Sequence, residues 1–226
     1  MRERKSKKDI EKKTRTSDKK TSPCHFHFGE TPSAVKNFLE LVKKHKRRGA
    51  VLDLGCDDGM NAIFFARHGY EGHGIDSHAE TIKRAKACAS KTGVSESTHF
   101  RIGDVFNLPY PERFFDVVID FGCFHHIPKT KWIDYLQSIL RVMKPDALLM
   151  LTVYTLRDKH VPNRTRQYVT HQGHYDYFFS KKDIKEIFEK HFDILSLTEE
   201  NLITPTQLKH SFYHVYMRRK QPEEEF

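Results

Sequence analysis

The chain is poor in cysteine and has no long apolar segment. Its four cysteines, at positions 24, 56, 88 and 123 of 226 residues, are scattered without a CxxC pair. This pattern argues against a disulfide framework and favours reduced thiols inside the cell. No run reaches the ~18 apolar residues that a membrane helix needs. We therefore expect a cytoplasmic protein with no membrane partner.

The N-terminal residues lack the apolar run of a secretory signal, and they are too rich in acids for a mitochondrial presequence. Residues 1–20 hold ten Lys or Arg against four Asp or Glu, a large share of the net charge of +9. Since Ile10 is their one aliphatic residue after Met1, we predict that residues 1–22 form a disordered basic tail. Residues 1–20 would bind RNA or an acidic partner weakly, although a solubilising role explains the charge equally well.

Behind the tail, segments with strand-like and helix-like apolar spacing alternate. Such alternation implies crossover connections and a mostly parallel sheet. The last two strands have no helix between them, so we expect the final one to pair antiparallel. We predict one domain over residues 23–220, followed by an acidic tail at 221–226. The predicted strands are 50–54, 71–75, 98–102, 115–120, 147–153, 192–198 and 211–217; the predicted helices are one from Thr31-Pro32 to Gly49, then 59–68, 78–91, 130–143 and 181–190.

A glycine turn after the first predicted strand is the most informative segment. Residues 50–59 read Ala-Val-Leu-Asp-Leu-Gly-Cys-Asp-Asp-Gly, and a helical pattern starts directly behind them. Such a turn presents backbone amides to a ligand at the carboxyl edge of a parallel sheet. Asp53, Asp76 and Asp104 close or follow three successive strands, and an acid about 20 residues after the turn suits a ribose diol. The pattern predicts a nucleoside-type cofactor.

Several of these segments together resemble one protein family. VLDLGCDDGMNAIFFARHGYEGHGIDSH, RIGDVFNLPY and FDVVIDFGCFHHIP look like the motifs of class I S-adenosylmethionine-dependent methyltransferases, over about residues 26–218. Asn61-Ala62-Ile63, residues 121–126 and the segment HFGETPSAVKNF are most similar to small-molecule members of the tellurite-resistance and thiopurine type. The resemblance implies an α/β, Rossmann-like seven-stranded sheet in the order 3-2-1-4-5-7-6. Strand 7 would be antiparallel, with helices on both faces.

The resemblance also implies which residues bind S-adenosylmethionine. The glycine turn would hold the methionine part, the acid after the second strand the ribose hydroxyls, the acid after the third strand the adenine, and the backbone after the fourth strand the α-ammonium. In chain order these residues are Asp53, Gly55, Cys56, Asp57, Gly59, Asp76, Ser77, Asp104, Val105, Asp120 and Phe121.

Asp57 departs from the family pattern, which usually has glycine at this place. A carboxylate here would either repel the methionine carboxylate of the cofactor or attract its ammonium and sulfonium. A catalytically weak S-adenosylmethionine-binding module therefore stays open as an alternative to an active enzyme.

Methyl transfer from a sulfonium asks the protein to align, desolvate and in some cases deprotonate the acceptor. His125 and His126 follow the fourth predicted strand, and histidine has a pKa suited to a general base. We predict both as catalytic residues, His125 foremost, together with Tyr154 at the end of the fifth strand. The alternative is that one histidine packs in the interior or caps the next helix.

Residues 154–180 form a connection of 27 residues that is rich in Arg, His and Tyr. Connections in α/β units are usually much shorter, so we predict a substrate lid. Arg164 and Arg166 would clamp an anionic substrate group, and Tyr177 would line the substrate site. A solvated basic loop with aromatic side chains packed on the sheet edge is the alternative.

We favour an enzyme, monomeric or dimeric, that moves a methyl group to a small-molecule thiol, oxyanion or amine by in-line displacement. RNA methylation, which the basic tail and the Arg/Tyr/His loop favour, is the alternative; an Asn-Pro-Pro-Tyr-type motif is missing after the fourth strand. Histidine is abundant, but Cys24-His25-x-His27 and His171-x-x-His174 do not give four ligands at a recognised spacing. We predict no metal site.

Overall fold

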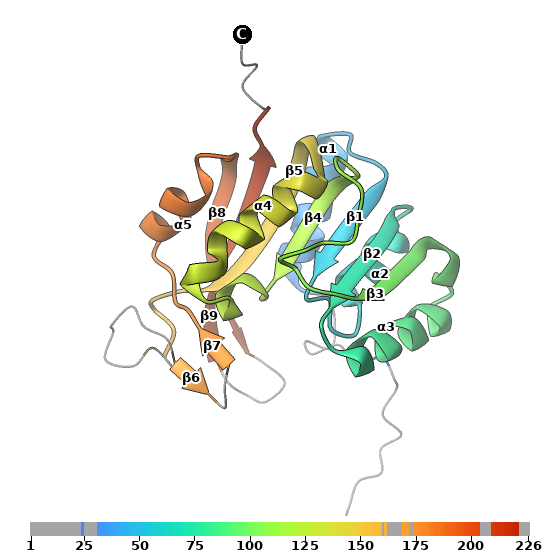
Figure 1. Cartoon of the computed structure of the whole chain (residues 1–226), viewed down its shortest axis with the longest axis horizontal. Helices are drawn as coiled ribbons and strands as arrows, with labels where there is room; N and C mark the ends of the chain where they lie inside the picture. The colour runs from blue at the N-terminus through green and yellow to red at the C-terminus, as the bar shows by residue number, and fades with distance from the viewer. Residues whose placement is uncertain are drawn as a thin grey trace, which may run out of the picture.

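The computed structural model of the protein describes residues 24, 31–159, 161, 169–171, 174–203 and 209–221. The predicted basic tail at 1–22, most of the predicted acidic tail, and the two predicted clamp residues Arg164 and Arg166 lie outside this part of the chain. Most of the described residues build one seven-stranded sheet with helices on both faces (Figure 1).

The sheet has the strand order β3-β2-β1-β4-β5-β9-β8. The first five strands of this order pair in parallel, and β9 pairs antiparallel with both β5 and β8. The short β6-β7 hairpin is not part of this sheet, so β8 and β9 are its sixth and seventh strands in chain order. The order is therefore the predicted 3-2-1-4-5-7-6, with an antiparallel seventh strand. The strands are β1 (Ala50–Leu54), β2 (Glu71–Asp76), β3 (Thr98–Ile102), β4 (Phe115–Phe121), β5 (Met143–Tyr154), β6 (Val169–His171), β7 (His174–Asp176), β8 (Phe192–Ile203) and β9 (Lys209–Arg219).

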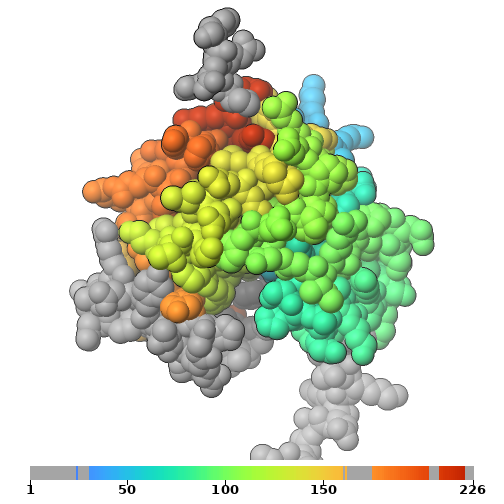
Figure 2. Space-filling view, in the orientation of Figure 1, coloured from blue at the N-terminus to red at the C-terminus, as the bar shows by residue number. Residues whose placement is uncertain are grey.

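Helices cover both faces of the sheet because each carries one apolar stripe. In α1, the residues Val35, Phe38, Leu39 and Val42 are buried at helical spacing, as predicted. Packing of α1, α2 and α3 buries one face of the sheet, and packing of α4 and α5 buries the other. In Figure 2, α4 runs across the middle of the front face. The bounds are α1 (Ser33–Lys44), α2 (Met60–Ala66), α3 (Ala79–Lys91), α4 (Trp132–Val142) and α5 (Lys181–Phe188).

The predicted ends of the first helix were wrong. Pro32, not Thr31, is the N-cap residue, and no side chain caps the helix there. The helix ends at Lys44 instead of continuing to Gly49, because the chain turns at Lys46, whose φ is 52°. The predicted connection 154–180 also contains an unexpected element, the β6-β7 hairpin.

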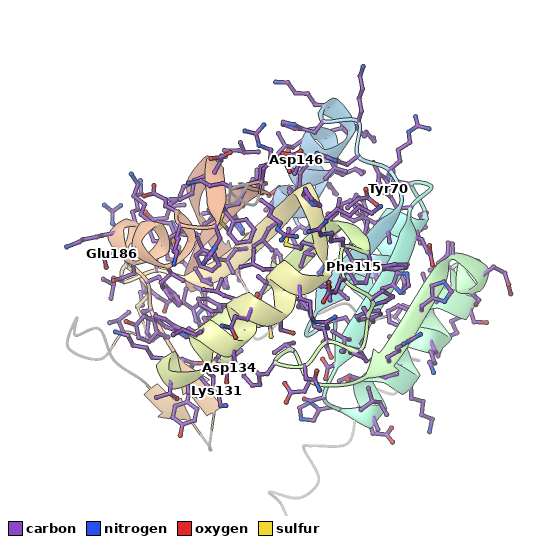
Figure 3. The ribbon with its side chains drawn as sticks, turned by 45° about the horizontal axis from the view of Figure 1, so that its top comes forward. Tyr70, Phe115, Lys131, Asp134, Asp146 and Glu186 are labelled. Atoms are coloured by element: carbon purple, nitrogen blue, oxygen red, sulfur yellow. The ribbon has the colours of Figure 1, made fainter. Side chains whose placement is uncertain are left out.

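The interior is aromatic next to the central strands, and the surface of α4 is charged. Phe115 on β4 is fully buried, whereas Lys131 and Asp134 form a 2.7 Å ion pair at the start of α4 (Figure 3).

Within the described ranges, no helix combines the length and the apolar character that crossing a bilayer demands.

Candidate functional site

The carboxyl ends of the central strands bring the predicted cofactor residues to one edge of the sheet. Leu54 at the end of β1 pairs in register with Ile75 on β2 and with Asp120 on β4. The segments that begin at Gly55, Asp76 and Phe121 therefore leave the sheet side by side. This is the edge at which open parallel sheets bind ligands.

The glycine turn packs closely against its neighbours because its glycines lack side chains. Gly55 and Gly59 have φ values of 61° and 78°, a region that side-chain-bearing residues rarely adopt. A Cβ on Gly55 would lie 3.1 Å from Cβ of Cys123, and one on Gly59 would lie 2.6 Å from the Phe100 ring. The amide of Cys56 donates to the Ile75 carbonyl at 3.0 Å and so fixes the turn against β2.

Asp57 takes a left-handed conformation, with a φ of 44°. Aspartate tolerates this region better than most side chains do, which explains why it stands where glycine is usual. Its amide donates to Oδ2 of Asp76 at 3.1 Å, and this bond ties the turn to the predicted ribose-binding acid. Arg84 on α3 lies 3.3 Å from Oδ1 of Asp57 and 2.6 Å from Oδ1 of Asp58. The negative charge that Asp57 adds to the turn is thus paired with the Arg84 guanidinium.

Asp53 is a buried carboxylate with one oxygen left for a ligand. Its Oδ1 accepts a 3.0 Å hydrogen bond from Asn61, whereas its Oδ2 is buried and has no hydrogen-bond partner among the described residues. Burial raises the pKa of Asp53 to about 7, with smaller contributions from the charges of Asp120 and Asp76. A positively charged ligand group would satisfy this oxygen and stabilise the ionised form, so the residues fit the ammonium of S-adenosylmethionine.

Asp120 shapes the turn after β4 with its side chain. Oδ1 accepts from the amides of Cys123 at 2.8 Å and Phe124 at 3.1 Å, and Oδ2 accepts from the Tyr135 hydroxyl at 2.6 Å. Burial outweighs these bonds and raises its pKa to about 6. Both oxygens of the carboxylate thus serve the fold, which leaves the Asp120–Phe121 backbone for the predicted cofactor contact.

The remaining predicted cofactor residues lie toward the outside of this edge. Asp104 is exposed and caps its own turn by accepting from the Phe106 amide at 2.9 Å. Val105 is half-buried against the core, and the exposed Ser77 contacts His78. After burial itself, the charges of Asp120, Asp76, Asp53 and Asp104 contribute to raising the pKa of the Cys123 thiol well above its usual value. The four carboxylates therefore all surround the Cys123 thiol closely enough to disfavour its ionisation.

The structure brings the three predicted catalytic residues together. His125 and His126 lie in a 3₁₀ turn (Phe124–His126), and their Nε2 atoms are 3.1 Å apart. The His125 ring stacks on Tyr154 with ring centres 3.9 Å apart. On its far side, His126 Nδ1 lies 2.8 Å from Oδ1 of Asp176 and 3.1 Å from the Tyr175 carbonyl. The imidazoles of His125 and His126 and the carboxylate of Asp176 thus form a chain of hydrogen-bonding groups.

The two imidazoles have opposite electrostatic environments. Burial, together with His126 and His210, holds the pKa of His125 well below its usual value, so this ring is neutral. Burial also opposes the charged form of His126, but the hydrogen bond and charge of Asp176 outweigh it and raise the pKa of His126. Nδ1 of His125 is buried and pairs with none of the residues that the structure describes. Burial raises the pKa of Tyr154 to about 12, so its phenol stays neutral.

His125 belongs to the turn after β4, and this turn packs against the glycine turn. A Cβ on Gly122, whose φ is 98°, would lie 3.4 Å from Cε1 of His125. The next residue, Cys123, is the one that a Cβ on Gly55 would meet. The turn that carries the histidine pair therefore packs against the glycine turn through Cys123.

Tyr177 occupies a different place from the predicted one. Its ring is buried in the core, with ring centres 4.8 Å from Trp132 and 4.6 Å from Phe179. Its amide donates to the His125 carbonyl at 2.8 Å, so its backbone positions the histidine turn. Sequence reasoning missed Asp176 and Arg84, because nothing in their local pattern marks them as site residues.

Comparison with known proteins agrees with this geometry. A family model described as a methyltransferase domain matches residues 27–195, so the chain belongs to this methyltransferase family. It is 32% identical over 148 residues to an uncharacterised methyltransferase of Schizosaccharomyces pombe, which covers 65% of this chain and 93% of that one. By fold and family it is a class I S-adenosylmethionine-dependent methyltransferase, and S-adenosylmethionine is its cofactor. The predicted class is confirmed.

Two further relatives have named substrates. The chain is 32% identical over 116 residues to the 2-heptyl-1-hydroxyquinolin-4(1H)-one methyltransferase of Mycobacteroides abscessus, covering 51% of each protein. It is 30% identical over 114 residues to norajmaline N-methyltransferase of Rauvolfia serpentina, covering 50% of this chain and 38% of the relative. The chain thus spans about half, or less, of the length of these two relatives.

A solved structure shares the fold. The Burkholderia thailandensis 1,6-didemethyltoxoflavin-N1-methyltransferase, solved with 1,6-didemethyltoxoflavin and S-adenosylhomocysteine bound, has a TM-score of 0.66 at 21% identity. The match covers 84% of this chain and 79% of that one.

Proposed function

We propose that the protein methylates an ionisable group of a small planar heterocycle, with His125 as the base. The observation that carries the proposal is the buried Nδ1 atom of His125, which has no hydrogen-bond partner in the described chain. Its ring lies in the turn after β4, where a Cβ on Gly122 would come within 3.4 Å of Cε1 of His125. A buried polar atom without a partner is costly, and a substrate O–H or N–H would relieve that cost.

The chain's residues hold the cofactor and leave the chemistry to it. S-adenosylmethionine, when bound, supplies a methyl group on a sulfonium, and the thioether that remains is a good leaving group. We infer that the turn at Gly55 holds the methionine part and that Oδ2 of Asp53 attracts its ammonium. Asp76 would accept from the ribose hydroxyls in addition to the backbone amides that its two oxygens already bind. The pairing of Asp57 with Arg84 limits repulsion of the methionine carboxylate.

The histidine pair moves the acceptor's proton away from the reacting atom. When His126 is neutral, its Nδ1–H donates to Asp176, and its Nε2 accepts from the Nε2–H of His125. Nδ1 of His125 then carries a lone pair that takes the substrate proton. The Nε2 proton of His125 passes to His126, so the positive charge ends beside Asp176 and not on the buried ring. This relay explains how a histidine with a strongly lowered pKa serves as a base.

Aromatic side chains around His125 support a planar substrate. Tyr154 stacks on His125 and also lies parallel to Phe212 and Phe178, with ring centres 5.0 Å and 5.5 Å away. Flat rings of this kind favour offset stacking of another ring. Three of the similar proteins are named for a hydroxyquinolone, norajmaline and a toxoflavin precursor as their substrates. We infer a heterocyclic O–H or N–H acceptor from the two observations together.

Two measurements test the proposal. Calorimetric titration with S-adenosylmethionine is expected to show binding to the native chain and at least tenfold weaker binding to Asp76→Ala. Methyl-labelled cofactor is then offered with N-hydroxyquinolones, phenols, amines, thiols and RNA. We expect the native chain to place the label on a heterocyclic O–H or N–H acceptor. The His125→Phe variant should not label that acceptor. Binding of cofactor without label in any acceptor would favour the silent module, and label in RNA alone would favour the nucleic-acid alternative.

A further inference from the structure

Three metal-ligating side chains converge at the edge of the sheet, away from the histidine pair. Glu71 and His73 lie on β2 and His99 lies on the edge strand β3, where the parallel register pairs it with His73. Oε1 of Glu71 lies 3.0 Å from Nε2 of His73 and 3.1 Å from Nε2 of His99. The three ligand atoms all lie within 4.8 Å of one another.

We propose that Glu71, His73 and His99 form a binding site for Zn²⁺ or a similar divalent transition-metal ion. Zn²⁺ binds imidazole nitrogen and carboxylate oxygen at about 2.0–2.2 Å, which places tetrahedral ligand atoms about 3.3 Å apart. The two nitrogen–oxygen distances are already close to this value. Two imidazoles and one carboxylate leave a fourth position for water, as in other three-ligand zinc sites.

The surroundings of His73 hold the ligands in place before an ion arrives. The His73 ring is buried, and the rings of Tyr110, Phe114 and Phe115 meet it edge to face at 5.2–5.7 Å (Phe115 is labelled in Figure 3). These ring contacts fix the orientation of the His73 imidazole toward Glu71. Glu71 and His99 are each nearly half exposed, which gives an ion access from solvent.

Two features limit the affinity of the site. Nδ1 of His73 is buried and lacks a partner among the described residues, whereas strong zinc sites usually hold that nitrogen with a carboxylate or carbonyl. Arg101 follows His99 by two residues on β3 and so places a positive charge on the same face of the strand. Its guanidinium lies over the Tyr110 ring at 5.4 Å and donates to the Pro109 carbonyl at 3.3 Å. The same charge would repel a metal cation.

The site is separate from the methyl-transfer edge. His73 precedes Asp76 by three residues on β2, a distance of roughly 10 Å along the strand. A bound ion would therefore link β2 to the edge strand β3 and would not contact the acceptor. The inference is independent of the proposed function, and either can fail alone.

Zinc titration of the full chain, freed of metal by chelator, tests the site. We expect one equivalent of Zn²⁺ to bind that Mg²⁺ does not replace, and this equivalent to weaken more than about 100-fold in His99→Ala and in Glu71→Gln. His68→Ala, which removes an exposed histidine elsewhere, serves as the matched control and should leave it unchanged. Arg101→Gln should tighten binding severalfold because it removes the repelling charge.

Two readouts make the result decisive. Hydrogen exchange of β3 amides should slow on addition of zinc in the native chain and not in His99→Ala, because the ion clips the edge strand to β2. Affinity for S-adenosylmethionine should be the same in both chains. Identical zinc isotherms for the native chain and His99→Ala, or no zinc binding by the native chain, would overturn the proposal.

Discussion

His125 and His126 face each other through their Nε2 atoms at 3.1 Å. A hydrogen bond between two such nitrogens contains a single proton, so the tautomers of the two rings depend on each other. When His126 is charged it donates to His125, and Nδ1 of His125 must then carry a proton. When His126 is neutral, Nδ1 of His125 is a free lone pair. The protonation of the outer ring thus controls whether the inner ring is a base.

The rate of methyl transfer should therefore rise with pH. Asp176 raises the pKa of His126 above its usual value, so the active, neutral pair is lost as pH falls through that raised pKa. In Asp176→Asn the pKa of His126 falls, and the acid limb of kcat/KM should move to lower pH by about 1–2 units. The pH profile of both chains measures this shift. An unchanged acid limb would show that His126 does not control the base.

Asp53→Asn should change stability and cofactor binding in opposite directions. The pKa of Asp53 is raised to about 7 in the folded protein, so its burial costs nothing below about pH 4; stability then falls as pH rises toward 7, and the loss is complete above that pH. The variant should gain about 2–3 kcal/mol in free energy of unfolding at pH 8 and little at pH 4. Its affinity for S-adenosylmethionine should fall at least tenfold because the ammonium loses its anionic partner. Denaturant unfolding at both pH values and calorimetry check the two effects.

The backbone at Asp57 should accept glycine and reject a β-branched residue. Because φ is 44°, Asp57→Gly should keep cofactor affinity within about threefold, whereas Asp57→Val should lose about 1–2 kcal/mol of unfolding free energy. Arg84→Gln should weaken cofactor binding severalfold, since Asp57 and Asp58 lose the guanidinium that faces them. Calorimetry of the three variants separates backbone strain from charge. Equal affinity in Arg84→Gln and the native chain would show that the pairing is irrelevant to binding.

Tyr135→Phe should destabilise the fold by about 1–3 kcal/mol, because Oδ2 of the buried Asp120 loses its donor. The double variant with Asp120→Asn completes a thermodynamic cycle, and a coupling energy near zero would contradict a direct bond. Thermal or denaturant unfolding supplies the four free energies.

The sequence predicted the fold well because its signals are local. The continuous apolar runs of β1 and β4 mark buried parallel strands, and the turn at Gly55 needs a backbone that glycine supplies. The edge of the sheet that carries Asp53 and Asp76 then follows from strand direction alone. The two residues of the histidine pair were predicted from their place after the fourth strand.

Partners that depend on register or on packing could not be predicted. Glu71 and His99 are far apart in the sequence, and they meet because β2 and β3 pair in one register and not another. Asp176 sits in a long connection whose path over the sheet has no periodic signal. Arg84 looks like an ordinary exposed helix residue until α3 packs beside the glycine turn. The residue-by-residue roles of the site, the basic-tail partner and the cytoplasmic location stay predictions.

Single-turnover methyl transfer from saturating cofactor, measured in the native chain and in His125→Phe with two acceptors, tests the account most directly. One acceptor should have a pKa above 8 and the other a pKa below 5, so that only the first needs deprotonation at about pH 7.5. The account predicts a loss of about 10²–10⁴-fold in His125→Phe for the first acceptor and a much smaller loss for the second. Equal losses for both acceptors, or no loss for either, would contradict His125 as the base.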